Sequence, residues 1–117
     1  MKLTNLGKFL RKFRIDNSLI LKNMADDLGV SSAYLSAIEY GIKPIPSNLE
    51  EKLIKKYNFK NELLSELRTA IDTSKEVMNI KTNNDFLNQQ ILGAFGRNLS
   101  SLNEEQKRKI LEIMENK

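Results

Sequence analysis

The stretch LKNMADDLGVSSAYLSAIEYG, residues 21–41, constrains the fold of this chain more than any other segment. Its apolar residues have the spacing of two short helices that face each other across a three-residue turn. Gly29 stands where the first helix must end, because glycine adopts the left-handed conformation without a Cβ penalty. Ser31 is a suitable N-cap for the second helix. The stretch therefore predicts a helix pair whose second helix is held outward from the core.

Helical spacing of apolar residues continues over most of the remaining chain, and no alternating pattern predicts a strand. A helix is predicted at about residues 4–16. The two prolines of GIKPIPS then separate the helix pair from a helix at about 48–57, with Ser47 as its N-cap. Another helix is predicted from Asn61 to about residue 79. Together with the helix pair, these segments make five helices.

The last third of the chain predicts two more helices after a polar interruption, KTNND, at residues 81–85. The first contains Gly93 and Gly96, and glycine weakens a helix. Asn103 and Gln106 have the spacing of a capping box at the start of the second. The chain as a whole therefore predicts an all-α fold.

The composition excludes several classes of function. Cysteine and histidine are absent, which removes disulfides, the usual zinc sites and the common nucleophile–base pairs, so no metal or cofactor is expected. The carboxylates, lysines, serines and tyrosines show no catalytic spacing, and an enzyme is not the expected reading. No run of 18 apolar residues could span a membrane, and the basic N-terminus lacks the apolar core of a signal peptide. We expect a cytoplasmic protein.

Positive charge is concentrated in the first half of the chain. Residues 1–60 carry 11 Lys and Arg against 6 Asp and Glu, whereas residues 61–117 carry 8 against 9. A basic front half suits an anionic partner such as DNA, although a net charge of this size also occurs in soluble domains with no such partner.

The segments LRKFR, MADDLGVS and YLSAIEYG, followed by the P-x-P loop and a further helix, resemble the Xre/Cro family of helix-turn-helix regulators. The resemblance covers about residues 6–68. It implies a five-helix, repressor-like helix-turn-helix domain in residues 1–70. Residues 71–117 are then expected to be a C-terminal helical extension used for dimerisation.

The outward face of the second helix of the pair is the candidate base-reading surface. At 100° per residue, Leu35 and Ile38 define the buried side. The opposite side carries small residues, and in the family that side contacts base edges: Ser32, Ala33, Ser36 and Ala37. Serine can donate to or accept from several bases, and alanine can touch a thymine methyl. The alternative is that these small groups pack against another helix.

Polar residues around this face are the candidate phosphate contacts. Many family members have Gln at the start of the first helix of the pair, where this chain has Leu21. We expect neighbouring and following residues to supply the phosphate contacts instead: Lys22, Asn23, Ser31, Tyr40 and Lys43. For the lysines, the alternative is a solvated surface position. Tyr34 could either pack in the core or reach a phosphate.

Arg14 and Glu39 match two positions that form a buried ion pair in several relatives. Two separate surface charges are the alternative. The pair would be structural, because it would fix how the second helix of the pair is held.

These features predict a sequence-specific, double-stranded DNA-binding transcriptional regulator, most simply a repressor that binds two half-sites as a homodimer. The C-terminal extension, residues 71–117, carries a second set of apolar residues that another surface would have to bury: Phe86, Ile91, Leu92, Phe95, Leu99, Ile110, Leu111 and Met114. The set could fold back on the fifth helix or meet a second chain, and we expect the homodimer to be held mainly by residues after about 70. The alternative is an antitoxin whose C-terminal segment binds a toxin protein and whose helix-turn-helix represses its own gene.

Overall fold

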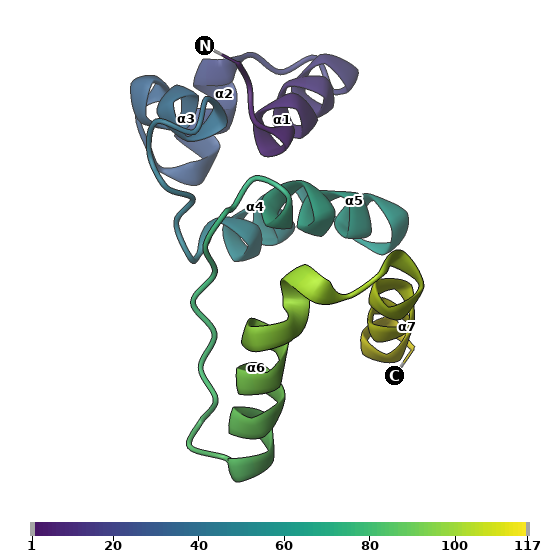
Figure 1. The fold of residues 1–117 in the computed structure, drawn as a ribbon. Coiled ribbons are helices and arrows are strands. Elements are labelled where there is room, and N and C mark those ends of the chain that lie inside the picture. Colours follow the sequence, from purple (N-terminus) through teal and green to yellow (C-terminus); the bar gives the residue numbers. More distant parts are fainter. Residues whose placement is uncertain (1, 117) are drawn as a thin grey trace. The chain divides into compact units, whose positions relative to one another are not determined.

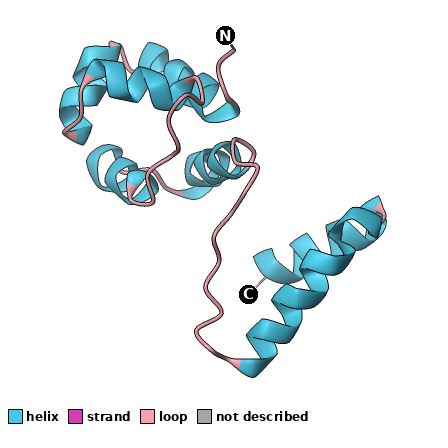
Figure 2. Ribbon diagram, turned by 60° about the vertical axis from the view of Figure 1, so that its left-hand side comes forward, coloured by secondary structure: helices cyan, strands magenta, loops and turns pink. Residues whose placement is uncertain are grey.

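The computed structural model describes residues 2–116, which form helices and no strand, and this confirms the predicted all-α class. The longest segment without helix covers residues 73–85 and is drawn as loop in Figure 2. In chain order (Figure 1), the elements are α1 (Asn5–Asp16), α2 (Leu21–Leu28), α3 (Ser32–Glu39), α4 (Leu49–Tyr57), α5 (Asn61–Asp72), α6 (Phe86–Asn98), the 3-10 helix η1 (Leu99–Ser101) and α7 (Glu104–Glu115).

The chain divides into two compact units, one that ends at Met78 and one that begins at Asn79. The first unit has a single core, to which all five of its helices contribute. Helix α1 packs against α2, α3 and α5, while α4 packs against α2 and α5. The buried apolar residues of this core are Leu6, Leu10, Met24, Ala25, Leu28, Leu35, Ile38, Leu49, Leu53, Phe59, Leu67, Ala70 and Ile71.

Aromatic rings close one side of this core. The ring of Phe13 lies 4.8 Å from that of Phe59 and 5.2 Å from that of Tyr57, measured between centroids. Phe9 also contacts Phe59, at 5.8 Å. Such tilted and edge-on pairs stabilise a core beyond the area they bury. They join α1 to the segment between α4 and α5.

Helix α4 begins one residue later than the sequence indicated. The prediction that Ser47 is its N-cap is wrong, because Asn48 occupies that position. The Leu49 N–H donates to the Pro46 carbonyl at 3.1 Å, so the chain is still turning at Ser47. Asn48 itself makes no side-chain capping bond.

Helix α5 ends at Asp72, and the prediction that it continues to about residue 79 is wrong. The hydroxyls of Thr73 and Ser74 donate to the carbonyls of Thr69 and Ala70, each at 2.7 Å. Side chains that satisfy last-turn carbonyls in this way compete with continuation of a helix. Ser74 Oγ also accepts from the Leu6 N–H at 2.8 Å, so it caps the start of α1.

The second unit contains α6, η1 and α7. Helix α6 runs without a break through Gly93 and Gly96. The predicted capping box of α7 is confirmed: Asn103 Oδ1 accepts from the Gln106 N–H at 2.8 Å, and Gln106 Oε1 accepts from the Asn103 N–H at 3.0 Å. No residue between Asn79 and Asn116 is buried. None of the helices described here is long and apolar enough to cross a membrane.

Gly7 lies where α1 passes closest to the end of α3. A Cβ at this position would overlap the carbonyl oxygen of Glu39 and would lie 3.0 Å from the carbonyl carbon. Both atoms belong to the backbone and cannot rotate away. The side chain at position 7 must therefore be a hydrogen for the two helices to approach in this way.

We expect Gly7→Ala to lower the free energy of unfolding by about 1–3 kcal/mol, since the extra methyl overpacks a rigid contact. Chemical denaturation of the full chain measures this loss. Lys8→Ala is the matched control, because Lys8 is the exposed neighbour on the same helix and should change stability by less than about 0.5 kcal/mol. Equal stability of the Gly7→Ala variant and the unmodified chain would show that the two helices can separate freely.

Candidate nucleic-acid interface

The turn between α2 and α3 is set by two residues with defined backbone roles. Gly29 adopts the left-handed conformation (φ 71°, ψ 31°), as predicted, and Val30 N–H donates to the Ala25 carbonyl at 3.0 Å. Ser31 is the N-cap of α3, also as predicted, and its Oγ accepts from the Tyr34 N–H at 3.1 Å. The turn from one helix into the next is therefore completed within three residues.

The outward side of α3 lies at the surface of the first unit. Leu35 and Ile38 are buried, as the helical spacing predicted. Ala33 is exposed, while the other members of the candidate base-reading face are half-buried: Ser32, Ser36 and Ala37. Within residues 2–116 neither serine hydroxyl makes a hydrogen bond. Both hydroxyls are therefore available to an external partner.

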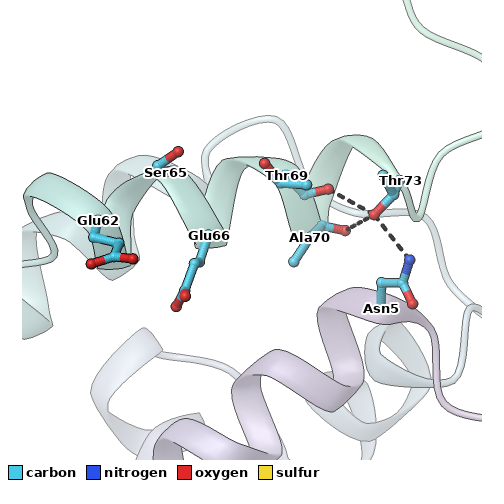
Figure 3. Close-up of a pocket in the computed structure, with 7 residues that line it drawn as sticks. All are labelled: Asn5, Glu62, Ser65, Glu66, Thr69, Ala70 and Thr73. Atoms are coloured by element: carbon cyan, nitrogen blue, oxygen red, sulfur yellow. Dashed lines mark hydrogen bonds between the residues drawn. The ribbon is translucent and has the colours of Figure 1, made fainter. Parts of the chain in front are cut away.

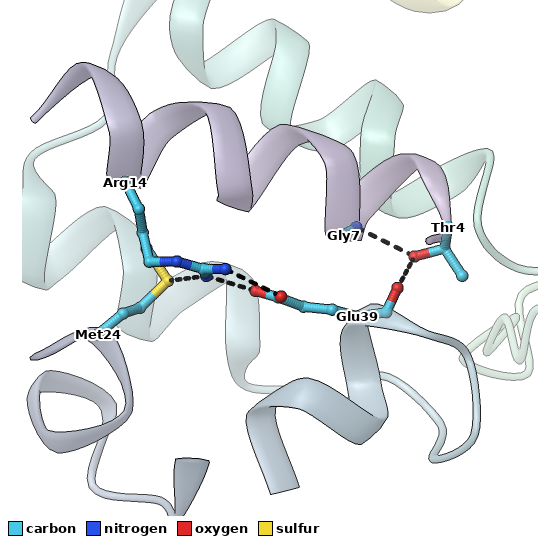
Figure 4. A network of polar contacts seen from close by, with 5 residues as sticks. All are labelled: Thr4, Gly7, Arg14, Met24 and Glu39. Atoms are coloured by element: carbon cyan, nitrogen blue, oxygen red, sulfur yellow. Dashed lines mark hydrogen bonds and ion pairs between the residues drawn. The ribbon is translucent and has the colours of Figure 1, made fainter. Parts of the chain in front are cut away.

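Arg14 and Glu39 form the buried ion pair that the resemblance implied, and they are not two separate surface charges. The guanidinium of Arg14 donates to both carboxylate oxygens of Glu39, at 2.5 and 3.1 Å. Only 7% of the arginine side chain and 2% of the glutamate side chain are exposed. The same guanidinium contacts the sulfur of Met24 at 3.4 Å (Figure 4). One residue from each of α1, α2 and α3 thus meets at this point.

The backbone of Glu39 is held as firmly as its side chain. Its carbonyl oxygen accepts from the N–H and the hydroxyl of Thr4, both at 2.9 Å. Thr4 Oγ1 in turn accepts from the Gly7 N–H at 3.0 Å and caps α1 (Figure 4). Thr4 and Gly7 were not singled out in the sequence analysis, although a threonine directly before an apolar helical pattern is typical of an N-cap. These contacts fix the end of α3 against the start of α1.

The predicted phosphate contacts occupy different surroundings. Lys22 is exposed and pairs with Asp26 at 3.2 Å. Asn23 Oδ1 accepts from the Ile20 N–H at 2.9 Å, which leaves its amide NH₂ to donate outward. Ser31 is exposed, and its hydroxyl hydrogen remains available while its oxygen caps α3. Lys43 is exposed in the loop after α3, and Tyr40 is half-buried at the end of that helix.

Tyr34 packs against the core, which is one of its two predicted roles. Tyr34 borders a small, partly open cavity together with Val30 and Pro46. A separate contact joins Tyr57 of α4 to Asp27 of α2. The Tyr57 hydroxyl donates to the Asp27 carboxylate at 2.7 Å, and the Lys56 ammonium lies 3.9 Å from the same carboxylate. Burial of the Tyr57 hydroxyl raises its pKa, and the hydrogen bond to Asp27 raises it further by a smaller amount. Asp27 therefore joins α2 to α4 rather than facing a ligand.

An open groove between α1 and α5 carries acidic and hydroxyl side chains (Figure 3). Asn5 Nδ2 donates to Thr73 Oγ1 at 3.0 Å, and that hydroxyl donates to the Thr69 carbonyl. These bonds fasten the start of α1 to the end of α5. Glu62 and Glu66 line the groove, but the described part of the chain has no cluster of three metal-ligating side chains.

Comparison of the chain with models of protein families, with curated proteins and with solved structures gave no match.

Glu39→Ala should lower the free energy of unfolding by on the order of 3 kcal/mol, because it leaves the buried Arg14 charge without its partner. Glu50→Ala is the matched control, since Glu50 pairs with Arg68 at 3.3 Å on the surface. That change should cost less than about 1 kcal/mol. Denaturation of both single variants and of Arg14→Met/Glu39→Leu separates the contributions. The apolar double variant should be more stable than Glu39→Ala; equal small losses at positions 39 and 50 would contradict the assigned role of the pair.

Proposed function

We propose that this protein is a sequence-specific, double-stranded DNA-binding transcriptional repressor of the Xre/Cro helix-turn-helix type. In this proposal α2 and α3 are the helix-turn-helix and α3 is the recognition helix. One observation carries it: α3 is fixed through Leu35, Ile38 and Glu39, while its opposite side presents small residues at the surface. A helix that is held in place and has small side chains on its outward face can enter the major groove, which is wide enough for an α-helix.

The starts of α2 and α3 would hold the phosphate backbone. Free N–H groups and the helix dipole favour an anion at a helix N-terminus. In this arrangement the Asn23 amide and the Ser31 hydroxyl would donate to phosphates. Lys43 would add a charge from the loop after α3, and Lys22 would exchange its exposed partner Asp26 for a phosphate. Such contacts set the position of the protein on the duplex and carry no sequence information themselves.

Sequence would be read by the outward face of α3. Ser32 and Ser36 would exchange hydrogen bonds with base edges, and Ala33 and Ala37 would contact thymine methyl groups. No arginine, asparagine or glutamine of α3 is available for a bidentate base contact. Direct readout is therefore sparse, and the shape of the operator would supply part of the specificity.

The repressor would act as a homodimer on two half-sites. A single helix-turn-helix of eight-residue helices makes few contacts, and a second copy raises the affinity through a high effective concentration. A repressor needs no chemistry beyond occupancy of its site.

An antitoxin is the second candidate function. It is favoured by the exposed apolar side chains of the second unit. Apolar side chains of that unit, such as Phe86 and Ile113, remain exposed within it, each at 74%. In an antitoxin, a toxin protein would cover them. A full chain that is monomeric alone and forms a stoichiometric complex with the product of an adjacent gene would favour this function.

Ser32→Glu tests the proposed role of α3. Glutamate in the first turn is compatible with the helix dipole, so the fold should persist. Operator affinity should fall by on the order of 100-fold or more, because a like charge facing DNA costs several kcal/mol. The measurement is fluorescence anisotropy with a selected duplex, together with circular dichroism.

The control for this test is Ser65→Glu, at an exposed serine on α5, which should keep full affinity. Binding by the unmodified chain should also weaken steeply with salt, because lysines and arginines displace condensed counterions. Unchanged affinity of a folded Ser32→Glu variant would remove α3 from the reading surface.

Thymine methyl contacts give a second test, which alters the DNA instead of the protein. Deoxyuridine in place of a contacted thymidine removes only the methyl group. We expect about a fourfold loss of affinity per contacted methyl, the value for burial of one such group. The loss should disappear with Ala33→Gly at the position that Ala33 contacts. Full affinity for an operator with every thymidine replaced would contradict this mode of reading.

A further inference from the structure

Ser74 lies just beyond the end of α5, at the start of the segment that leads to the second unit. Its hydroxyl is held on two sides. It donates to the Ala70 carbonyl in the last turn of α5 at 2.7 Å and accepts from the Leu6 N–H of α1 at 2.8 Å. An N–H in the first turn of a helix has no partner within that helix, and Leu6 is fully buried, so water cannot take the place of Ser74. The Leu6 N–H therefore depends on this one hydroxyl.

The same turn of α1 also holds the end of α3. Gly7 follows Leu6, and its backbone lies against the Glu39 carbonyl with no room for a methyl group. Thr4, the N-cap of α1, donates its N–H and its hydroxyl to that carbonyl. Leu6 thus lies between two residues that fix α1 to α3. A displacement of Leu6 would also displace these neighbours and, with them, the end of α3.

Helix α1 is the connection between Ser74 and α3. Among the five helices of the first unit, only α1 packs against both α3 and α5, while α3 and α5 do not pack against each other. The hydroxyl that closes α5 can therefore influence α3 through the first turn of α1.

We propose that Ser74 is a positioning residue for the recognition helix. By holding the buried Leu6 N–H, it fixes the first turn of α1 and, through the Glu39 carbonyl, the orientation in which α3 meets base edges. The inference rests on the proposed function and adds to it a residue that contacts no DNA. Base contacts carry the sequence information and depend on where α3 lies, whereas non-specific binding depends on charge. Loss of the Ser74 hydroxyl should therefore lower sequence discrimination more than general affinity for DNA.

The ratio of operator affinity to affinity for a random duplex tests this role, at a temperature where circular dichroism shows every variant folded. Ser74→Ala in the full chain should lower operator affinity by about tenfold, within the range that residues without ligand contact can produce. Affinity for the random duplex should stay within about twofold, because the charges are unchanged. A ratio equal to that of the unmodified chain would overturn the inference.

Two further variants separate this role from a general loss of packing. Thr73→Val removes the neighbouring hydroxyl, whose bond with Asn5 Nδ2 is exposed and can be replaced by water (Figure 3). This variant should keep the ratio of the unmodified chain. Ser74→Thr retains an acceptor oxygen and should restore most of the discrimination that Ser74→Ala loses. An equal loss in Thr73→Val and Ser74→Ala would contradict the assignment to Ser74.

Amide chemical shifts of the DNA-free chain distinguish a failure of this inference from a failure of the proposed function. The amides of Tyr40 and Gly41 directly follow α3 and donate to its carbonyls. Their shifts should change in Ser74→Ala and not in Thr73→Val. If they do so but the unmodified chain prefers no duplex, the positioning of α3 by Ser74 is supported and the proposed function fails. If the unmodified chain binds an operator specifically but Ser74→Ala changes neither the shifts nor the ratio, this inference fails and the function stands.

Discussion

Glu39 is the residue on which the geometry of the first unit depends. Its carboxylate pairs with Arg14, and its carbonyl oxygen accepts two hydrogen bonds from Thr4. Arg14 lies near the end of α1 and Thr4 immediately before its start, so α3 is tied to α1 at both ends of that helix. The buried charges are costly to desolvate, and the pair is better understood as fixing one orientation of α3 than as adding stability. Gly7 then permits the close approach that the carbonyl contact requires.

The helix pair was predictable from the sequence because each of its parts has a local physical signature. Gly29 supplies a left-handed residue, Ser31 supplies a cap, and the buried positions repeat at helical intervals. The Arg14–Glu39 pair was predicted in another way, through a resemblance, since no local rule connects residues 25 positions apart. The structure contains the pair with both partners buried.

The wrong prediction for the end of α5 has a physical cause, which is that hydroxyl side chains end this helix although its apolar pattern continues. Beyond Asp72 the apolar spacing continues, yet Thr73 and Ser74 take the last carbonyls of α5 and end it. The importance of Thr4 and Gly7 was equally hidden, because it arises from contact with Glu39 in a distant helix. Local patterns report which face of a helix is apolar. They do not report which hydroxyl will find a carbonyl from another part of the chain.

Ser74 has a consequence for how the first unit opens. Its oxygen holds the Leu6 N–H, so the first turn of α1 and the residue just past α5 share one hydrogen bond. Helix ends usually fray independently, and their amides exchange with solvent through local opening. Here neither end can fray without releasing the other, and Leu6 itself is fully buried. Opening at either helix end therefore breaks the bond that protects the Leu6 amide proton, so exchange of this proton with solvent reports on both ends together.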